Sequence, residues 1–248
     1  MNVWITGGSS GIGLALARHY ATQGHQVTVS ARPGARLDAA RPQLTPLGVH
    51  IEPLDVTDET AVGETVARIE AARGPIDLAV LNAGTYEPIS ATNFTSARAR
   101  ALMEVNYFSV CHALQALLPR YKARGTGQLA VMASIAGYRG LPYAGIYSAA
   151  KSAAIRLCES LHPELRAAGI QLSVINPGFV KTPLTDLNEF RMPFLISAEE
   201  AAVKIGEGIA SGQFEIRFPR RMAWLMGFLT HLPYAAWFGL ARRMLRSS

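Results

Sequence analysis

Cysteine and charge are both scarce in this sequence. Its 248 residues contain two cysteines, Cys111 and Cys158, and both fall inside segments with a helical pattern. That number and placement exclude a disulfide framework and a cysteine metal site, so we expect both thiols to be small buried hydrophobic groups. Charged residues make up 17% of the chain and apolar residues 49%, which argues against disorder and suits a buried sheet covered by helices.

The sequence also lacks a linker, low-complexity stretch or internal repeat that would divide it. A chain of 248 residues then suits one large α/β core. The six histidines are scattered without the spacing of metal ligands, so no metal site is expected. An apolar strand begins almost at Met1 and runs directly into a glycine-rich turn, a pattern unlike a signal peptide, so we expect a cytoplasmic protein.

Acidic residues are absent after Glu215. Beyond it the charged residues are six arginines: Arg217, Arg220, Arg221, Arg242, Arg243 and Arg246. All 18 acidic residues lie in the first 216 residues together with the other basic ones, so the net charge of +6 comes from the tail. Nothing in the body therefore favours a nucleic-acid partner.

Short β-branched runs alternate with longer helical patterns along the chain. The expected strands are 3–6, 26–31, 49–54, 76–81, 128–133 and 170–175, and the expected helices are 11–23, 58–73, 98–124, 147–168 and 197–211. This rhythm predicts an α/β fold, a doubly wound (Rossmann) parallel sheet with helices on both faces. We expect a catalytic domain at 1–216 and a basic, apolar, helical C-terminal extension at 217–248. Ligands of such sheets bind beyond the carboxyl ends of the strands.

A glycine-rich turn joins the first expected strand to the first expected helix. Its candidate cofactor-binding residues are Gly7, Ser9, Ser10, Gly11, Ile12 and Gly13. Glycines permit a tight turn and a close backbone approach to phosphate, and the positive N-terminus of the next helix favours an anion. No lysine follows the turn, so the pattern differs from that of nucleotide triphosphatases.

The residues that follow the second, third and fourth expected strands suit the other parts of a dinucleotide. Arg32 ends the second strand, where an enzyme that prefers NAD would usually carry an acidic residue. Because a guanidinium pairs well with a 2′-phosphate, the sequence favours NADP(H) over NAD(H). Asp55 can accept a hydrogen bond from adenine and Val56 can add a backbone contact, while Asn82, Ala83 and Gly84 let the backbone pass close to the cofactor.

Tyr147 and Lys151 place a phenol and an ammonium one helical turn apart, and Ser134 stands thirteen residues upstream at the end of an expected strand. Tyrosine titrates near 10 in water, so it is a poor acid–base catalyst at neutral pH unless a nearby cation stabilises its phenolate. We therefore expect Lys151 to bring the Tyr147 pKa towards the operating range. This spacing alone is common, and the accompanying motifs give it weight.

Over residues 2–212 the chain resembles the classical short-chain dehydrogenase/reductase family. The resemblance rests on the glycine turn, Asp55, Asn82–Gly84, Asn106, Ser134, Tyr147, Lys151 and the pair Pro177 and Gly178, in the family's order and close to its spacings. It implies that Tyr147 is the general acid–base, that Lys151 holds the nicotinamide ribose, that Ser134 stabilises the substrate oxygen and that Asn106 maintains a helix kink in the proton relay. Pro177, Gly178, Val180 and Thr182 would lie near the nicotinamide.

The resemblance implies an NADPH-dependent carbonyl reductase, or equivalently an alcohol dehydrogenase. It also implies a homodimer or homotetramer built on the long helices at 98–124 and 147–168. A non-catalytic dinucleotide sensor with the same fold is the alternative. Retention of Asn106, Ser134, Tyr147 and Lys151 together weighs against it, because a sensor has no evident use for the proton donor.

Two segments are candidates for the substrate site. Their apolar members are Tyr138, Leu141 and Tyr143 in 135–146, and Leu184, Leu187, Phe190, Met192, Phe194 and Leu195 in 183–196. If they line the site, the substrate is a small hydrophobic ketone or alcohol; otherwise they pack against the tail or a second subunit.

In the tail, apolar runs at 222–229 and 234–240 are flanked by arginines, and two interpretations stay open for 218–245. Either this segment lies at the inner face of a membrane, or it packs on protein.

Overall fold

A seven-stranded parallel sheet forms the centre of the molecule, and the computed structural model describes residues 1–187 and 192–245. The strand order is β3-β2-β1-β4-β5-β6-β7. The strands are β1 Asn2–Thr6, β2 Gln26–Ala31, β3 His50–Pro53, β4 Leu78–Leu81, β5 Gly127–Met132, β6 Ile170–Pro177 and β7 Glu215–Phe218. The helices are α1 Gly11–Thr22, α2 Ala35–Leu44, α3 Glu59–Arg73, α4 Ser96–Met103, α5 Ser109–Arg124, α6 Gly145–Ala167, α7 Ala198–Ala210, α8 Arg220–Thr230 and α9 Tyr234–Arg242.

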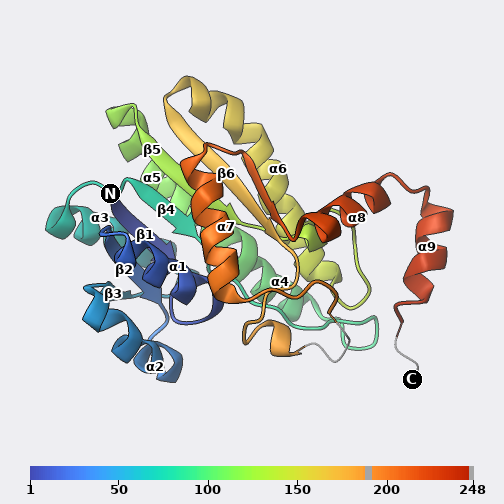
Figure 1. Cartoon of the computed structure of the whole chain (residues 1–248). Helices are drawn as coiled ribbons and strands as arrows, with labels where there is room; N and C mark the ends of the chain where they lie inside the picture. The colour runs from blue at the N-terminus through green and yellow to red at the C-terminus, as the bar shows by residue number, and fades with distance from the viewer. Residues whose placement is uncertain (188–191, 246–248) are drawn as a thin grey trace.

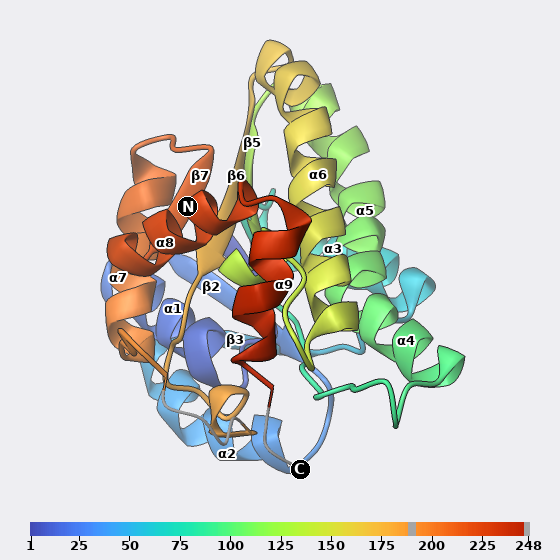
Figure 2. The same cartoon turned by 90° about the vertical axis from the view of Figure 1, so that its right-hand side faces the viewer.

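Helices cover both faces of this sheet, which confirms the doubly wound α/β prediction. In Figure 2, α1, α2 and α7 lie on one side of the sheet and α3, α5 and α6 on the other. Each side has its own hydrophobic core, because parallel strands are buried on both faces. Trp4 points into the core under α3 and α5, while its neighbours Val3 and Ile5 point into the core under α1 and α7.

Two elements were not expected from the sequence. Helix α2 is polar, contains Pro42 and buries only Leu37, Ala40 and Leu44, so its apolar pattern is weak. Strand β7 has four residues and pairs with the end of β6, with Phe218 opposite Pro177. Because β7 spans Glu215–Phe218, it crosses the boundary expected between residues 216 and 217 and joins the start of the tail to the central sheet.

The long helix expected at 98–124 is broken. Residues Glu104–Phe108 form a π-helical turn between α4 and α5. Such bulges occur frequently at functional sites, and this one contains Asn106.

The tail forms two short helices, α8 and α9, which stand at the outer edge of the molecule (Figure 1). Their inner sides pack with Ile135 in a third hydrophobic cluster, to which Tyr138, Leu141 and Phe179 add contacts. Packing on the body is therefore part of the tail's role. Among the described residues, no helix is long and apolar enough to cross a membrane.

Candidate active site

A cleft of about 740 Å³ opens at the carboxyl ends of the central strands. In the strand order, β2 lies on one side of β1 and β4 on the other. The cleft is at this switch point, where doubly wound sheets bind ligands. The predicted site residues that line it are Gly7, Ser9, Ser10, Gly11, Ile12, Arg32, Asp55, Val56, Asn82, Ala83, Gly84, Asn106, Ser134, Tyr147, Lys151, Pro177, Gly178, Val180 and Thr182. Among the predicted site residues, all of which are described, Gly13 alone stands outside this lining.

The glycine turn is packed tightly against the end of β4. Gly7 has φ of 70°, and a Cβ added to it would lie 2.8 Å from the Ala83 Cα atom. The side-chain Nδ2 atom of Asn82 donates to the carbonyl oxygens of Thr6 and Gly7, at 3.0 and 3.2 Å. A Cβ on Gly13 would lie 2.3 Å from the Gly7 oxygen, so Gly13 acts through backbone packing beneath the turn.

The first turn of α1 offers backbone donors to the cleft. Its N-cap residue, Ser10, makes no side-chain cap hydrogen bond, and the turn contains no acidic residue. Gly11 and Ile12 line the cleft there. An uncapped helix N-terminus with exposed N–H groups favours an anion, so this end of the cleft fits a pyrophosphate.

Two arginines border the far end of the cleft. Arg32 follows β2 and Arg36 lies in the first turn of α2, and both are exposed. Arg36 is a residue that sequence reasoning missed. An arginine four residues after Arg32 was a visible signal, but it had meaning only once 35–44 was known to be a helix.

Asp55 and Val56 follow β3 and line the same end. One Asp55 carboxylate oxygen accepts hydrogen bonds from the Thr57 amide and hydroxyl, at 3.0 and 2.8 Å. The Val56 carbonyl contacts His112 Nδ1 of α5 at 3.1 Å. These contacts fix the turn that presents Asp55 to the cleft.

Tyr147 and Lys151 lie on the first turns of α6 and face Ser134, which follows β5. The Lys151 Nζ atom lies 5.7 Å from the Tyr147 ring centre and donates to the Met132 carbonyl at 2.9 Å. Ser134 hydrogen-bonds Tyr147 and also donates to the Pro177 carbonyl at 3.4 Å. The three side chains predicted to share the chemistry are therefore adjacent.

Burial controls the protonation of this pair. It raises the pKa of Tyr147 to about 12, against the hydrogen bond with Ser134, which lowers it. It also lowers the pKa of Lys151 to about 8. The expected drop of the Tyr147 pKa is therefore wrong for the protein alone: desolvation of the phenolate outweighs the hydrogen bond. At neutral pH Tyr147 keeps its proton and can act as a donor.

Asn106 connects the π-helical turn to this group. Its Nδ2 atom donates to the carbonyls of Thr85 and Leu102, both at 2.9 Å, and its Oδ1 atom accepts from the Thr85 amide at 3.2 Å. A Cβ on Gly84 would lie 3.1 Å from the Asn106 Oδ1 atom and 3.5 Å from Lys151 Nζ. Glycine at position 84 is what allows these two side chains to approach the β4 turn.

The segment after β6 closes the cleft over the glycine turn. Thr182 approaches the turn so closely that a Cβ on Gly11 would lie 2.9 Å from its methyl carbon. Val180 forms an isolated bridge with Ile196, and the Thr182 amide donates to the Thr185 hydroxyl at 2.9 Å. The predicted nicotinamide end is thus held in place by its own loop.

Tyr86 is a second residue that sequence reasoning missed. Its ring packs edge-on against Tyr147, with 5.3 Å between ring centres, and it lines the cleft with Thr85. The signal was its position two residues after Gly84. Residues that continue a turn at the end of a central strand remain close to the site.

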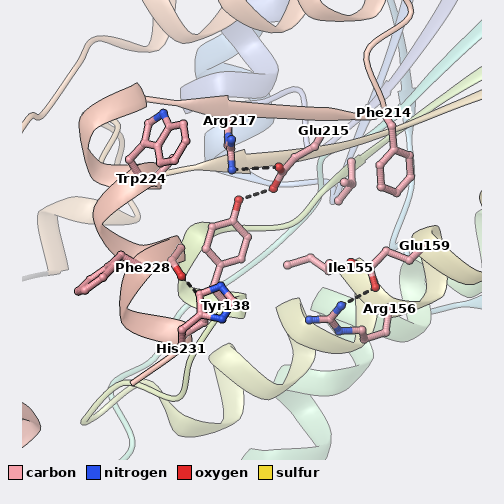
Figure 3. A pocket seen from close by; sticks show the side chains of 14 residues that line it. Tyr138, Ile155, Arg156, Glu159, Phe214, Glu215, Arg217, Trp224, Phe228 and His231 are labelled. Atoms are coloured by element: carbon pink, nitrogen blue, oxygen red, sulfur yellow. Dashed lines mark hydrogen bonds and ion pairs between the residues drawn. The ribbon is translucent and has the colours of Figure 1, made fainter. Parts of the chain in front are cut away.

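The predicted substrate residues divide between the cleft and the tail. Leu184 lines the cleft. Tyr138 does not, because its hydroxyl points away and donates to Glu215 beside a second pocket of about 560 Å³ (Figure 3). Leu141 packs in the tail cluster, as the alternative interpretation expected. Phe190 lies outside the described residues.

A family model of short chain dehydrogenases matches residues 1–191. The chain belongs to this family. An uncharacterized oxidoreductase of Myxococcus xanthus is 36% identical over 242 residues, covering 97% of this chain and 96% of that protein, so the likeness includes most of the tail. Estradiol 17-beta-dehydrogenase 1 of Rattus norvegicus is 39% identical over 190 residues, covering 73% of this chain and 54% of that one.

Solved structures of the short chain dehydrogenase fold match as well. A member from Burkholderia phymatum in complex with NAD has a TM-score of 0.83 at 24% identity, with 91% of each chain covered. ElxO with NADP bound has a TM-score of 0.79 at 24% identity, covering 87% of this chain and 96% of that one. The fold therefore accommodates either dinucleotide, and the preference depends on local residues.

Proposed function

We propose that this short chain dehydrogenase is an NADP(H)-dependent oxidoreductase acting on the carbonyl or alcohol carbon of a small hydrophobic substrate. The observation that carries the proposal is the placement of Tyr147 beside the buried side chains of Ser134, Lys151 and Asn106 at the end of a dinucleotide-sized cleft. When bound, the nicotinamide dinucleotide supplies or accepts the hydride, and the protein supplies orientation and a proton.

The lining of the cleft fits such a cofactor. The first turn of α1 would bind the pyrophosphate, Arg32 and Arg36 the 2′-phosphate, and Asp55 the adenine. Lys151 would hold the nicotinamide ribose, and the backbone of 177–182 would contact the carboxamide. Among the residues that line the described cleft, Asp55 is the only acidic one, whereas Arg32 and Arg36 are both basic. This end of the cleft therefore favours the extra phosphate.

Tyr147 and Ser134 carry the proton chemistry in this proposal. Both hydroxyls hydrogen-bond the substrate oxygen, and in reduction the developing alkoxide takes the Tyr147 proton. The pKa of about 12 keeps that proton available at neutral pH, while Lys151 provides positive charge below its own pKa of about 8. Leu184 and Tyr86 give the open end an apolar wall. We also propose a homodimer or homotetramer, on the basis of family membership.

Removing the Arg32 guanidinium is expected to weaken NADPH binding about tenfold and leave NADH binding unchanged, since a charge-assisted hydrogen bond contributes roughly 1.5–3 kcal/mol and Arg32 is solvent-exposed. Fluorescence titration of both cofactors against the parent, Arg32→Ala and Arg36→Ala measures this. Arg41→Ala is the matched control, because Arg41 lies on α2 outside the cleft. Equal losses for NADPH and NADH in Arg32→Ala would contradict a role in phosphate recognition.

Carbonyl reduction is expected to slow as the pH rises through about 8, the pKa to which burial lowers Lys151. Below that pH the ammonium is present; above it the amine is neutral and stabilises neither the ribose contact nor the developing phenolate. Tyr147, with a pKa of about 12, stays protonated throughout this range, so its titration does not cause the fall in rate. The measurement is kcat/KM against pH in the NADPH-driven direction. A profile that is flat through pH 8 and 9 would contradict it.

A further inference from the structure

Large apolar side chains are exposed along the two tail helices. They are Trp224, Leu225 and Phe228 on α8, Tyr234 and Phe238 on α9, and Met244 and Leu245 after α9. Trp224 is 69% exposed and Phe228 67%, values unusual for aromatic rings. We call these seven residues the tail face.

The tail face is presented by a fixed scaffold. The opposite side of α8 is buried through Met222, Ala223 and Met226, and α9 is anchored by Trp237, which is 3% exposed. Arg139, five residues after Ser134, donates to the Thr230 and Leu232 carbonyls at 2.5 and 3.1 Å. Its guanidinium also lies 5.2 Å from the rings of Tyr234 and Trp237. The turn between the helices is therefore clamped to the body.

The two tail helices carry only positive charge, and the acidic side chains near them, Glu159 and Glu215, belong to the body and line the pocket beside Trp224 and Phe228. Among the described residues of the tail, the charged side chains are Arg217, Arg220, Arg221, Arg242 and Arg243, all exposed. Arg217 contacts Glu215 at 3.4 Å and stacks near the Trp224 ring, at 5.5 Å (Figure 3). Nothing acidic follows Glu215 in the sequence, so the other arginines have no acidic neighbour along the tail.

We propose that the tail face binds the surface of a bilayer containing anionic lipids. Aromatic and aliphatic side chains would enter the headgroup boundary while the arginines pair with lipid phosphates, the arrangement of interfacial amphipathic helices. A second copy of the chain fits less well. A twofold interface places the same patch of both copies together, and here it would bring arginines against arginines.

Tryptophan fluorescence tests the proposal directly, because the chain has three tryptophans and only Trp224 is exposed; Trp4 and Trp237 are buried. The full chain is titrated with vesicles of phosphatidylcholine alone and with vesicles that also contain phosphatidylglycerol. The expected result is a blue shift with the anionic vesicles and quenching by brominated acyl chains. Trp224→Phe should still co-sediment with these vesicles and lose the shift.

Two paired variants separate the apolar and the electrostatic contributions. Trp224→Ser with Phe228→Ser should abolish co-sedimentation. Arg242→Gln with Arg243→Gln should weaken binding roughly thirtyfold, since each basic residue near an anionic surface adds about 1 kcal/mol. Phe94→Ser and Arg41→Gln are the matched controls, because Phe94 is 54% exposed, Arg41 lies on α2, and neither residue belongs to the tail.

Two results would overturn the proposal. One is absence of binding to both kinds of vesicle. The other is concentration-dependent self-association in sedimentation velocity that Trp224→Ser with Phe228→Ser removes, which would make the tail face an interface between copies. Because the replaced side chains are exposed, unchanged thermal unfolding and unchanged NADPH titration verify that each variant is folded.

Discussion

Replacing Tyr147 by phenylalanine is expected to lower turnover by about 10²–10⁴, the usual contribution of a positioned proton donor, with little change in NADPH affinity. The ring stays, so its packing against Tyr86 is kept, and only the hydroxyl beside Ser134 is lost. The measurement is NADPH oxidation at saturating cofactor over a panel of apolar ketones and aldehydes, with NADPH titration of the same preparations.

Tyr20→Phe is the matched control for this experiment. Burial raises the pKa of Tyr20 to about 12, as for Tyr147, but its hydroxyl has no hydrogen-bond partner among the described residues and lies in α1 away from the cleft lining. Removing it takes away the same atom from another phenol whose pKa is raised by desolvation, without touching the proposed proton path. Absence of turnover in both the parent and Tyr147→Phe would instead support the non-catalytic dinucleotide sensor, and measurable turnover that is equal in both would contradict the role of Tyr147 as proton donor.

Most of the sheet could be predicted because its strands are buried on both faces. Strands β1, β2, β4, β5 and β6 read as apolar, β-branched runs, and helices α1, α5 and α6 between them bury an apolar face. Strand β7 escaped prediction since a four-residue edge strand with alternating burial carries too little pattern. The π-helical turn at 104–108 lies where the family resemblance implies a kink at Asn106, but its form could not be predicted, because nothing in its residues marks an extra residue per turn.

The candidate site was predictable to the extent that its residues follow strand ends. Parallel strands bring those ends to one edge, so Ser134, Asn82–Gly84 and Pro177 meet at the cleft. Side-chain direction could not be predicted in the same way. Tyr138, four residues after Ser134, follows a 3-10 turn that directs its hydroxyl to Glu215 on β7. Its direction depends on a strand that the sequence did not reveal.

The pKa of Tyr147 illustrates a different limit. The spacing of Tyr147 and Lys151 predicts proximity, and the structure places the ammonium 5.7 Å from the ring centre. Proximity does not reveal desolvation, however, and it is desolvation that raises the pKa of Tyr147 and lowers that of Lys151. Both groups are thereby displaced towards their neutral forms.

Replacing Gly13 by alanine is expected to destabilise the fold by about 3 kcal/mol, at the upper end of overpacking costs, and to abolish measurable NADPH binding. The added Cβ would lie 2.3 Å from the Gly7 carbonyl oxygen and 2.5 Å from Asn82 Nδ2. A backbone oxygen cannot rotate away, so the turn itself must shift, and with it the N–H groups at the start of α1. Urea unfolding and NADPH titration measure the two effects.

Gly63→Ala, in the middle of α3, is the matched control. Nothing lies within 4 Å of a Cβ at that position, and alanine is favoured over glycine inside a helix by roughly 0.5–1 kcal/mol. The same substitution should thus stabilise the protein at one glycine and disable it at another. If Gly13→Ala unfolds at the parent's urea midpoint and still binds NADPH, the turn tolerates the methyl group. Glycine at position 13 would then not be required for packing beneath the turn, and the close fit of the turn to the cofactor would have to come from Gly7 and Gly11.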